Sequence, residues 1–164
     1  MVAEPIQVLL VEDNPGDADL TRESLKTSQL QIELTVVVNG TQAINLLHKR
    51  GQFASRLTPD LILLDLNLPG LDGRAVLWNI KRDDGLRHIP VCVLSSSAAE
   101  VDVLESYHMG ANCYVVKPID FKTFQGIVRA VENFWFTVVK LPCRSEPPVG
   151  RLAPVSPTKL TPGP

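Results

Sequence analysis

The feature that most constrains the fold of this chain is a series of short apolar runs separated by segments with helical periodicity. The runs are rich in Val, Ile and Leu, and they are Ile6–Val11, Leu34–Val38, Leu61–Asp65, Val91–Leu94 and Tyr114–Val116. Most are nearly continuous rather than alternating, which is typical of strands buried on both faces of a parallel sheet. The pattern therefore predicts an α/β domain in which strands and helices alternate.

Capping signals and helical spacing place the helices. The first is expected from Pro15 to about Ser28, because an asparagine stands before a proline at its start. Asn39 and the glycine after it could form a hairpin turn, but the apolar residues that follow recur at helical spacing and favour a helix. Further helices are expected over 73–82 and 98–109. Gly70 and Gly73 are interpreted as turn formers. The clearest helix carries an apolar stripe made of Phe121, Phe124, Ile127, Val128, Val131, Phe134, Trp135 and Val138.

The order of these elements is βαβαβαβαβα. It predicts a flavodoxin-like, doubly wound (βα)5 fold with right-handed crossovers and a parallel sheet of strand order 2-1-3-4-5. Residues 1–141 are assigned to this domain. Seven of the thirteen prolines lie between Pro142 and Pro164, so residues 142–164 are expected to be a disordered Pro-rich tail, with no second domain.

Composition excludes several classes of function. A formal net charge of −2 gives no electrostatic basis for binding nucleic acid. No apolar run reaches about 18 residues, so no membrane span is expected, and the N-terminus lacks the pattern of a secretory signal. Cys92 and Cys113 lie in apolar runs and are interpreted as small buried hydrophobic residues, because no CxxC or Cys/His spacing supports a metal or redox role. A reducing cytoplasm fits such cysteines best.

Polar and charged residues stand at the ends of the predicted strands, where doubly wound folds place their sites. The first strand ends in Glu12 and Asp13, the third in Asp65, the fourth in Ser95 and the fifth in Lys117. Two carboxylates about 4 Å apart repel by about 4 kcal/mol at an effective dielectric constant of about 20, so positive charge is needed. Lys117 supplies one charge, and a hard cation with oxygen ligands, Mg²⁺, would supply the rest. Such a site favours transfer of a phosphoryl group to a carboxylate.

Four segments, VLLVEDN, PDLILLDLNLPGLDG, IPVCVLSSS and CYVVKP, resemble the motifs of bacterial response-regulator receivers in order and spacing. The resemblance covers about residues 6–138. It implies that Asp65 accepts a phosphoryl group from the phosphohistidine of a sensor histidine kinase. It also implies that Asp13 and Asp65 bind Mg²⁺ directly, that Glu12 assists through water, and that Asn67 offers its backbone carbonyl to the metal.

The same resemblance implies the parts of a switch. Ser95 donates its hydroxyl to the phosphoryl group and moves with it, while Lys117 pairs with a phosphoryl oxygen. Tyr114 occupies the position of the switch aromatic residue and turns inward when Ser95 moves. The bond before Pro118 is expected to be cis. Glu12 replaces the commoner aspartate and Ser95 the commoner threonine, and both exchanges keep the chemistry. A phosphoacceptor of this kind catalyses its own phosphotransfer and dephosphorylation, and is not otherwise an enzyme.

Three further stretches, VEDNPGDADLTRESL, WNIKRDDGLRHIPVCVLSSS and NFWFTVVKLP, resemble the small receivers that partner phytochrome-type sensor kinases. Those proteins lack an output domain and tend to dimerise through the face that includes the last helix. Phe134, Trp135 and Phe136 are consecutive, so they cannot all face one core. At least one is expected to be exposed or buried in a homodimer; packing beneath the tail is the alternative.

Other functions remain open at this point. A flavin-binding electron carrier of flavodoxin type could share the strand order, but it needs a Ser/Thr/Gly-rich phosphate loop after the first strand, where this chain is acidic. A phosphatase or mutase that uses an aspartyl phosphate would need a second acid where Asn67 stands. A pseudo-receiver that binds partners without accepting phosphate is the third alternative, and the intact set of strand-end residues argues against it.

Overall fold

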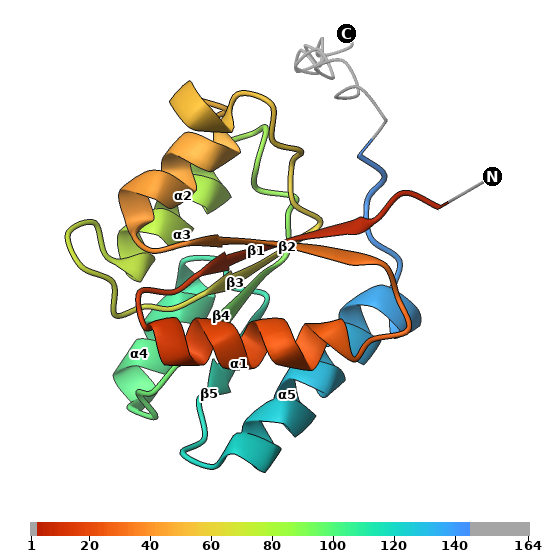
Figure 1. Ribbon diagram of the computed structural model, residues 1–164. Helices are drawn as coiled ribbons and strands as arrows, with labels where there is room; N and C mark the ends of the chain where they lie inside the picture. The colour runs from red at the N-terminus through yellow and green to blue at the C-terminus, as the bar shows by residue number, and fades with distance from the viewer. Residues whose placement is uncertain (1–2, 145–164) are drawn as a thin grey trace, which may run out of the picture.

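The computed structural model of the chain describes residues 3–144. Within this range, parallel strands form one sheet of order β2-β1-β3-β4-β5 (Figure 1). The strands are β1 (Ile6–Val11), β2 (Ile32–Val37), β3 (Leu61–Leu64), β4 (Val91–Ser95) and β5 (Cys113–Val116). The predicted α/β fold class and the flavodoxin-like order 2-1-3-4-5 are confirmed.

The helices cover both faces of the sheet, with α1 and α5 on one side and α2 and α3 on the other (Figure 1). They are α1 (Pro15–Lys26), α2 (Gly40–Leu47), α3 (Gly73–Arg82), α4 (Glu100–His108) and α5 (Phe121–Asn133), with a short 3-10 helix, η1 (Gly51–Phe53). Each of four helices begins where a polar side chain accepts a hydrogen bond from a backbone N–H of the first turn; these caps are Asn14, Asn39, Asp72 and Asp120. The first, third and fourth helices agree with the prediction within about two residues, as helix ends usually do.

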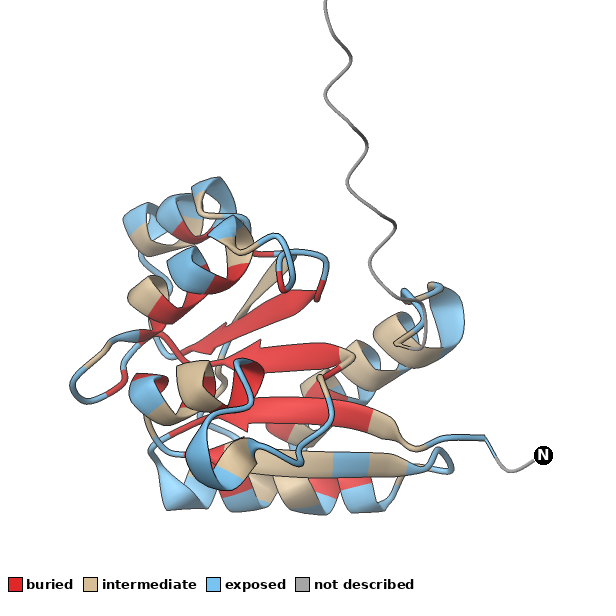
Figure 2. Cartoon of the chain, turned by 90° about the horizontal axis from the view of Figure 1, so that it is seen from above, coloured by how far each residue is buried: buried red, intermediate tan, exposed pale blue. Residues whose placement is uncertain are grey.

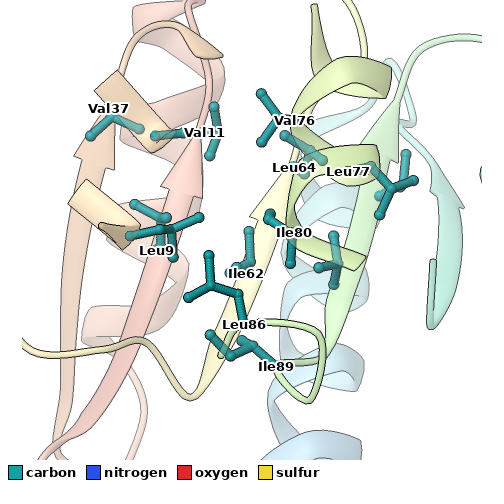
Figure 3. Close-up of a cluster of buried hydrophobic side chains, with 14 of the residues drawn as sticks. Leu9, Val11, Val37, Ile62, Leu64, Val76, Leu77, Ile80, Leu86 and Ile89 are labelled. Carbon is teal, nitrogen blue, oxygen red and sulfur yellow. The ribbon is translucent and has the colours of Figure 1, made fainter. Parts of the chain in front are cut away.

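The core explains why the strands read as continuous apolar runs. Leu9 and Val11 lie in the hydrophobic cluster on the side of α2 and α3, whereas Val8 and Leu10 lie in the cluster on the side of α1 and α5. Figure 2 shows the central strands buried along their length, and Figure 3 shows the first cluster between the sheet and α3. Burying each such leucine stabilises the fold by about 1.5–3 kcal/mol, so both faces of the sheet must remain covered.

The apolar stripe of the last helix is not uniformly buried, contrary to the simplest interpretation of its spacing. Regular helix α5 ends at Asn133, and the chain continues as a π-helix, η2 (Phe134–Val138). Phe124 and Val128 are buried, whereas 46% of Phe121 and 64% of Val138 are exposed. Beyond Asn133 the wider π-helical turn displaces the end of the stripe, including Val138, from the buried face, whereas Phe121 is exposed in the first turn of α5 itself.

The prediction of a cis bond before Pro118 is wrong for this structure, because no peptide bond within residues 3–144 is cis. An X–Pro bond prefers the trans form by about 0.5–1 kcal/mol. Lys117 reaches its ionic partners with the following bond in that form, so nothing in the local geometry requires the less stable isomer.

The first residues of the predicted tail are described, and Arg144 docks beside the start of β1. Its guanidinium lies 3.0 Å from the carboxylate of Asp60 and donates a hydrogen bond of 2.9 Å to the carbonyl of Pro5. The prediction of disorder for residues 145–164 lies outside the described residues. Among residues 3–144, none of the helices has both the length and the apolar character that crossing a bilayer requires.

Candidate functional site

Three carboxylates meet at the carboxyl ends of β1 and β3. These strands are adjacent, and Val11 and Leu64, their last residues, are register partners. The chain then leads directly into Glu12, Asp13 and Asp65, and one carboxylate oxygen from each lies within 4.8 Å of the others. Remote segments are thus brought together by the parallel pairing, as the sequence predicted.

Burial differs across this cluster and gives it an open side. Glu12 and Asp65 are buried, with 2% and 6% of their surfaces exposed, whereas Asp13 is exposed. Burial raises the pKa of Glu12 to about 7, although its ion pair with Lys117 opposes that change. The exposed Asp13 marks the side from which an ion or a phosphoryl donor can approach.

Lys117, at the end of β5, is the cation of the cluster. Its ammonium donates to the carboxylates of Glu12 and, at 3.0 Å in each case, to those of Asp17 and Asp65. Burial on its own would lower the pKa of Lys117, but the ion pairs with Glu12 and Asp65 outweigh it and raise that pKa above its ordinary value. Lys117 is therefore held as a permanent positive charge beside Asp65.

Asp17 was not singled out from the sequence, although the structure makes it a third partner of Lys117. It lies in the first turn of α1, where an acidic residue is expected simply because it complements the helix dipole. The only signal in the sequence is its place in the first turn of the helix that follows Glu12 and Asp13, which keeps it near the same end of the sheet.

The loop after β3 holds Asp65 in place. The backbone N–H of Asn67 donates a 3.0 Å hydrogen bond to the Asp65 carboxylate. Gly73, the first residue of α3, approaches so closely that a Cβ there would lie 2.1 Å from the carbonyl oxygen of Asp65 and 2.5 Å from the Cα of Leu66. Gly70 is a turn former with a φ of 70°; Gly73 has no positive φ, and close approach to Asp65 is the reason that it lacks a side chain.

Ser95 and Tyr114 are linked through the loop that follows β4. Ser95 is fully buried, and its hydroxyl oxygen accepts a 3.2 Å hydrogen bond from the backbone N–H of Ser97. The Tyr114 hydroxyl donates to the backbone carbonyl of Ser97 at 2.8 Å, and its ring packs against the cluster on the α2 and α3 side. Both residues thus contact Ser97, from opposite ends of its backbone.

Two residues that sequence reasoning missed anchor the same loop. The Ser97 hydroxyl donates to Asp102 at 2.5 Å, and Asp102 also forms an ion pair with Arg74 of α3. The hydrogen bond from Ser97 and then the one from Arg74 hold the pKa of Asp102 below its ordinary value. Both are half-buried, but nothing in the local pattern of the sequence distinguishes them from charged residues on the solvent face of a helix.

The consecutive aromatic residues lie at the far end of α5, away from the acidic cluster. Phe134 is 47% exposed, so the expectation that at least one of them is not in the core is confirmed. Trp135 and Phe136 pack against the cluster on the α1 and α5 side, and the Phe134 and Trp135 rings meet edge to face with centroids 5.1 Å apart. Their use in a dimer stays a prediction.

The donor set fits a hard divalent cation. Within the described residues, the cluster contains the carboxylates of Glu12, Asp13, Asp17 and Asp65 but the ammonium of Lys117 alone, so negative charge is in excess. Carboxylate oxygens at this spacing, with neither histidine nor cysteine among them, suit Mg²⁺ or Mn²⁺ rather than zinc. Fold and site together define a doubly wound α/β domain with an acidic centre, suited to a divalent cation, at the carboxyl edge of its sheet.

Comparison with known proteins identifies the family. A family model described as the response regulator receiver domain matches residues 8–129. The response regulator Rcp1 of Synechocystis sp. (strain ATCC 27184 / PCC 6803 / Kazusa) is 44% identical over 138 residues, covering 84% of this chain and 94% of Rcp1. The chain belongs to the response regulator receiver family.

Solved structures agree with this assignment. The crystal structure of the phosphorylated cyanobacterial phytochrome response regulator RcpA matches with a TM-score of 0.83 and 42% identity, covering 85% of this chain and 100% of RcpA. The Mn²⁺-bound form of Rcp1 matches with a TM-score of 0.82 and 43% identity, over 85% of this chain and 100% of that one. The family displaces both the flavin carrier and the phosphatase or mutase as interpretations of the fold.

Proposed function

We propose that this protein is a response regulator whose receiver domain accepts a phosphoryl group on Asp65 from a sensor histidine kinase, with Mg²⁺ bound by Glu12, Asp13, Asp65 and the backbone of Asn67. The observation that carries the proposal is the placement of the Lys117 ammonium 3.0 Å from Asp65, within a cluster of further carboxylates. In this arrangement a nucleophilic carboxylate, a fixed cation and oxygen ligands for a metal lie side by side.

The residues of the chain divide the chemistry of transfer among them. An oxygen of Asp65 attacks the phosphorus atom of a phosphohistidine, the new P–O bond forms as the P–N bond breaks, and the histidine leaves with the bonding pair. The Asn67 N–H orients the Asp65 carboxylate through its 3.0 Å hydrogen bond. Lys117 pairs with a phosphoryl oxygen, and Ser95 donates its hydroxyl to another. When bound, a divalent cation neutralises charge on the phosphoryl oxygens.

Phosphorylation acts as a switch in this proposal. A phosphoryl group adds charge of about −1.5 to −2 beside Asp65, and this charge attracts the ammonium of Lys117 and the hydroxyl of Ser95. Movement of Ser95 changes the hydrogen bond that its hydroxyl oxygen accepts from the backbone N–H of Ser97. The carbonyl oxygen of Ser97 in turn accepts a hydrogen bond from the hydroxyl of Tyr114. Phosphorylation of Asp65 is therefore expected to change the position of Tyr114, and with it the surface formed by α4, β5 and α5, through Ser97.

The proposed partner is a phytochrome-type sensor kinase in the cytoplasm, and no nucleic acid is involved. RcpA is described as a cyanobacterial phytochrome response regulator, and it is 42% identical to this chain. Radiolabelled phosphate transfer from purified, autophosphorylated kinases to the protein tests this part. Transfer that is fastest from a phytochrome-type kinase and absent from Asp65→Asn is expected. Equal labelling of the variant, or a wild type that no kinase labels, contradicts the phosphoacceptor proposal and leaves the pseudo-receiver.

A homodimer that buries the exposed ring of Phe134 is part of the proposal, and Trp135, which packs on the core, holds that ring edge to face. Sedimentation at micromolar concentration, with and without phosphorylation, tests it. A dimer weakened by Phe134→Ser is expected, with the exposed Phe121→Ser as the matched control. A monomer in both states contradicts it.

A further inference from the structure

Cys92 and Cys113 face each other across adjacent strands. Cys92 lies in β4 and Cys113 begins β5, and the two are register partners in the parallel pairing. Neighbouring strands lie about 4.8 Å apart, which is within the Cα separation of about 4.4–6.8 Å found for disulfides. Both are free thiols and both pack in the cluster on the α1 and α5 side, so their side chains leave the sheet on the same face.

The two thiols differ in environment. Cys92 is completely buried, whereas Cys113 is half-buried at the edge of the sheet. A hydrogen bond from the Cys92 thiol, aided by one from the Trp135 indole, lowers the pKa of Cys113 against the effect of burial. The same contact with Cys113, together with burial, raises the pKa of Cys92 well above its ordinary value. Cys113 is thus the more accessible and the more nucleophilic of the two.

We propose that Cys92 and Cys113 form a reversible oxidation site that is converted by hydroperoxides into a disulfide between β4 and β5. The Cys113 thiolate attacks the peroxide, its sulfur gains one oxygen as a sulfenic acid, and the other peroxide oxygen leaves as water or an alcohol after taking a proton. The Cys92 thiol then attacks the sulfur of Cys113, the S–S bond forms, and the sulfenic oxygen leaves as water. The peroxide is reduced by two electrons, and a dithiol reverses the change.

This site is separate from the phosphorylation site. Cys92 and Cys113 lie near the amino ends of β4 and β5, whereas Ser95 and Lys117 lie at or beyond the carboxyl ends of the same strands. Cys113 contacts Trp135, which belongs to the aromatic segment after α5. A cross-link bonds the Cys113 sulfur, which accepts from the indole, to the Cys92 sulfur and turns it into a disulfide sulfur. The oxidation state of the pair thereby changes the surroundings of Trp135.

The experiment treats the full-length protein, carrying Cys143→Ser to leave only this pair, with hydrogen peroxide. The expected product has lost two hydrogen atoms by intact mass. Digestion under non-reducing conditions should give a peptide in which a disulfide joins Cys92 to Cys113. Dithiothreitol should return the protein to its initial mass. Trp135 fluorescence is expected to change in parallel, with Trp78 providing a constant background.

Single variants separate the two roles. Cys92→Ala is expected to stop at a Cys113 sulfenic acid that dimedone traps, whereas Cys113→Ala is expected to slow oxidation of Cys92 by about tenfold or more. If either variant fails to fold, the peptide map of the two-cysteine protein still decides. Sulfinic acid on Cys113 with no cross-link, or two thiols that remain unreacted while the exposed Cys143 of the wild type oxidises, would overturn the proposal.

Discussion

The ammonium of Lys117 lies 3.0 Å from the carboxylate of Asp65, 52 residues earlier in the chain. The same ammonium binds Glu12 and Asp17, so in this structure its donors are used by carboxylates of the protein. A phosphoryl group on Asp65 must take one of these donors for itself. Asp17 and the phosphoryl group therefore compete for hydrogen bonds from Lys117, and a substitution at Asp17 should change the outcome of that competition.

Asp17→Asn is expected to raise the level of Asp65 phosphorylation by acetyl phosphate about fivefold to tenfold, because a neutral amide binds the Lys117 ammonium about 1–1.4 kcal/mol more weakly than a carboxylate does and competes less with the phosphoryl group. The quantity measured is the phosphorylated fraction at fixed Mg²⁺. Asp19→Asn, on the same helix in an ion pair with the exposed Arg22, is the matched control. A level unchanged or lowered in Asp17→Asn contradicts the competition.

Gly73→Ala is expected to lower the free energy of unfolding by about 1–3 kcal/mol and to slow phosphorylation, because its Cβ would lie 2.1 Å from the Asp65 carbonyl oxygen. Urea denaturation and the initial rate of labelling measure the two effects. Gly126→Ala in α5 is the control, since a Cβ there meets no atom within 4 Å; it should stabilise the helix by about 0.5–1 kcal/mol. Equal behaviour of the two variants would show that Gly73 does not position Asp65.

Tyr114→Phe is expected to lower the free energy of unfolding by about 1 kcal/mol, because the hydroxyl that donates to Ser97 is lost. Phosphorylation of Asp65 should proceed at the wild-type rate, while the change in dimer affinity that follows phosphorylation becomes smaller. Sedimentation of the phosphorylated and unphosphorylated proteins measures that change. A response of full size in this variant argues against transmission through the Tyr114 hydroxyl.

Lys81 provides a pH dependence outside the acidic cluster. Burial lowers its pKa to about 8 from an ordinary value of 10.5, and its ammonium donates to the carbonyls of Arg87 and Ile89. Between these two values the unfolded chain binds more protons than the folded chain, so the contribution of Lys81 to stability rises with pH across that interval. Urea denaturation should show the wild type gaining stability relative to Lys81→Met over this range. The exposed Lys122→Met is the control, and parallel curves for the wild type and Lys81→Met contradict the prediction.

The fold and the central carboxylates could be predicted because they depend on periodic and topological rules. Continuous apolar runs indicate strands covered on both faces, and parallel pairing then requires Glu12 and Asp65 to meet at one edge of the sheet. These conclusions need only the order of the elements. They do not depend on the rotamer of any side chain.

The remaining features depend on distances between segments that the sequence does not encode locally. Asp17 looks like an ordinary acidic residue of a first helical turn until Lys117 is seen to reach it. Gly73 looks like a turn residue, yet the reason for it is the proximity of the Asp65 backbone. Cys92 and Cys113 look like isolated hydrophobic residues because their partnership is a matter of strand register. The π-helix after Asn133 likewise has no signal in the local pattern, and the bond before Pro118 has the trans form that X–Pro bonds ordinarily prefer.

The most direct test of the proposal that Asp65 accepts a phosphoryl group in a magnesium-binding pocket is the intact mass of the protein after incubation with acetyl phosphate, followed by peptide mapping. We expect one added phosphoryl group on Asp65. It should form only when Mg²⁺ is present, fail to form when a chelator is added first, and be absent from Asp65→Asn. A phosphoryl group on another residue, an adduct that forms equally well in the chelator, or a wild type that never gains mass would contradict the account.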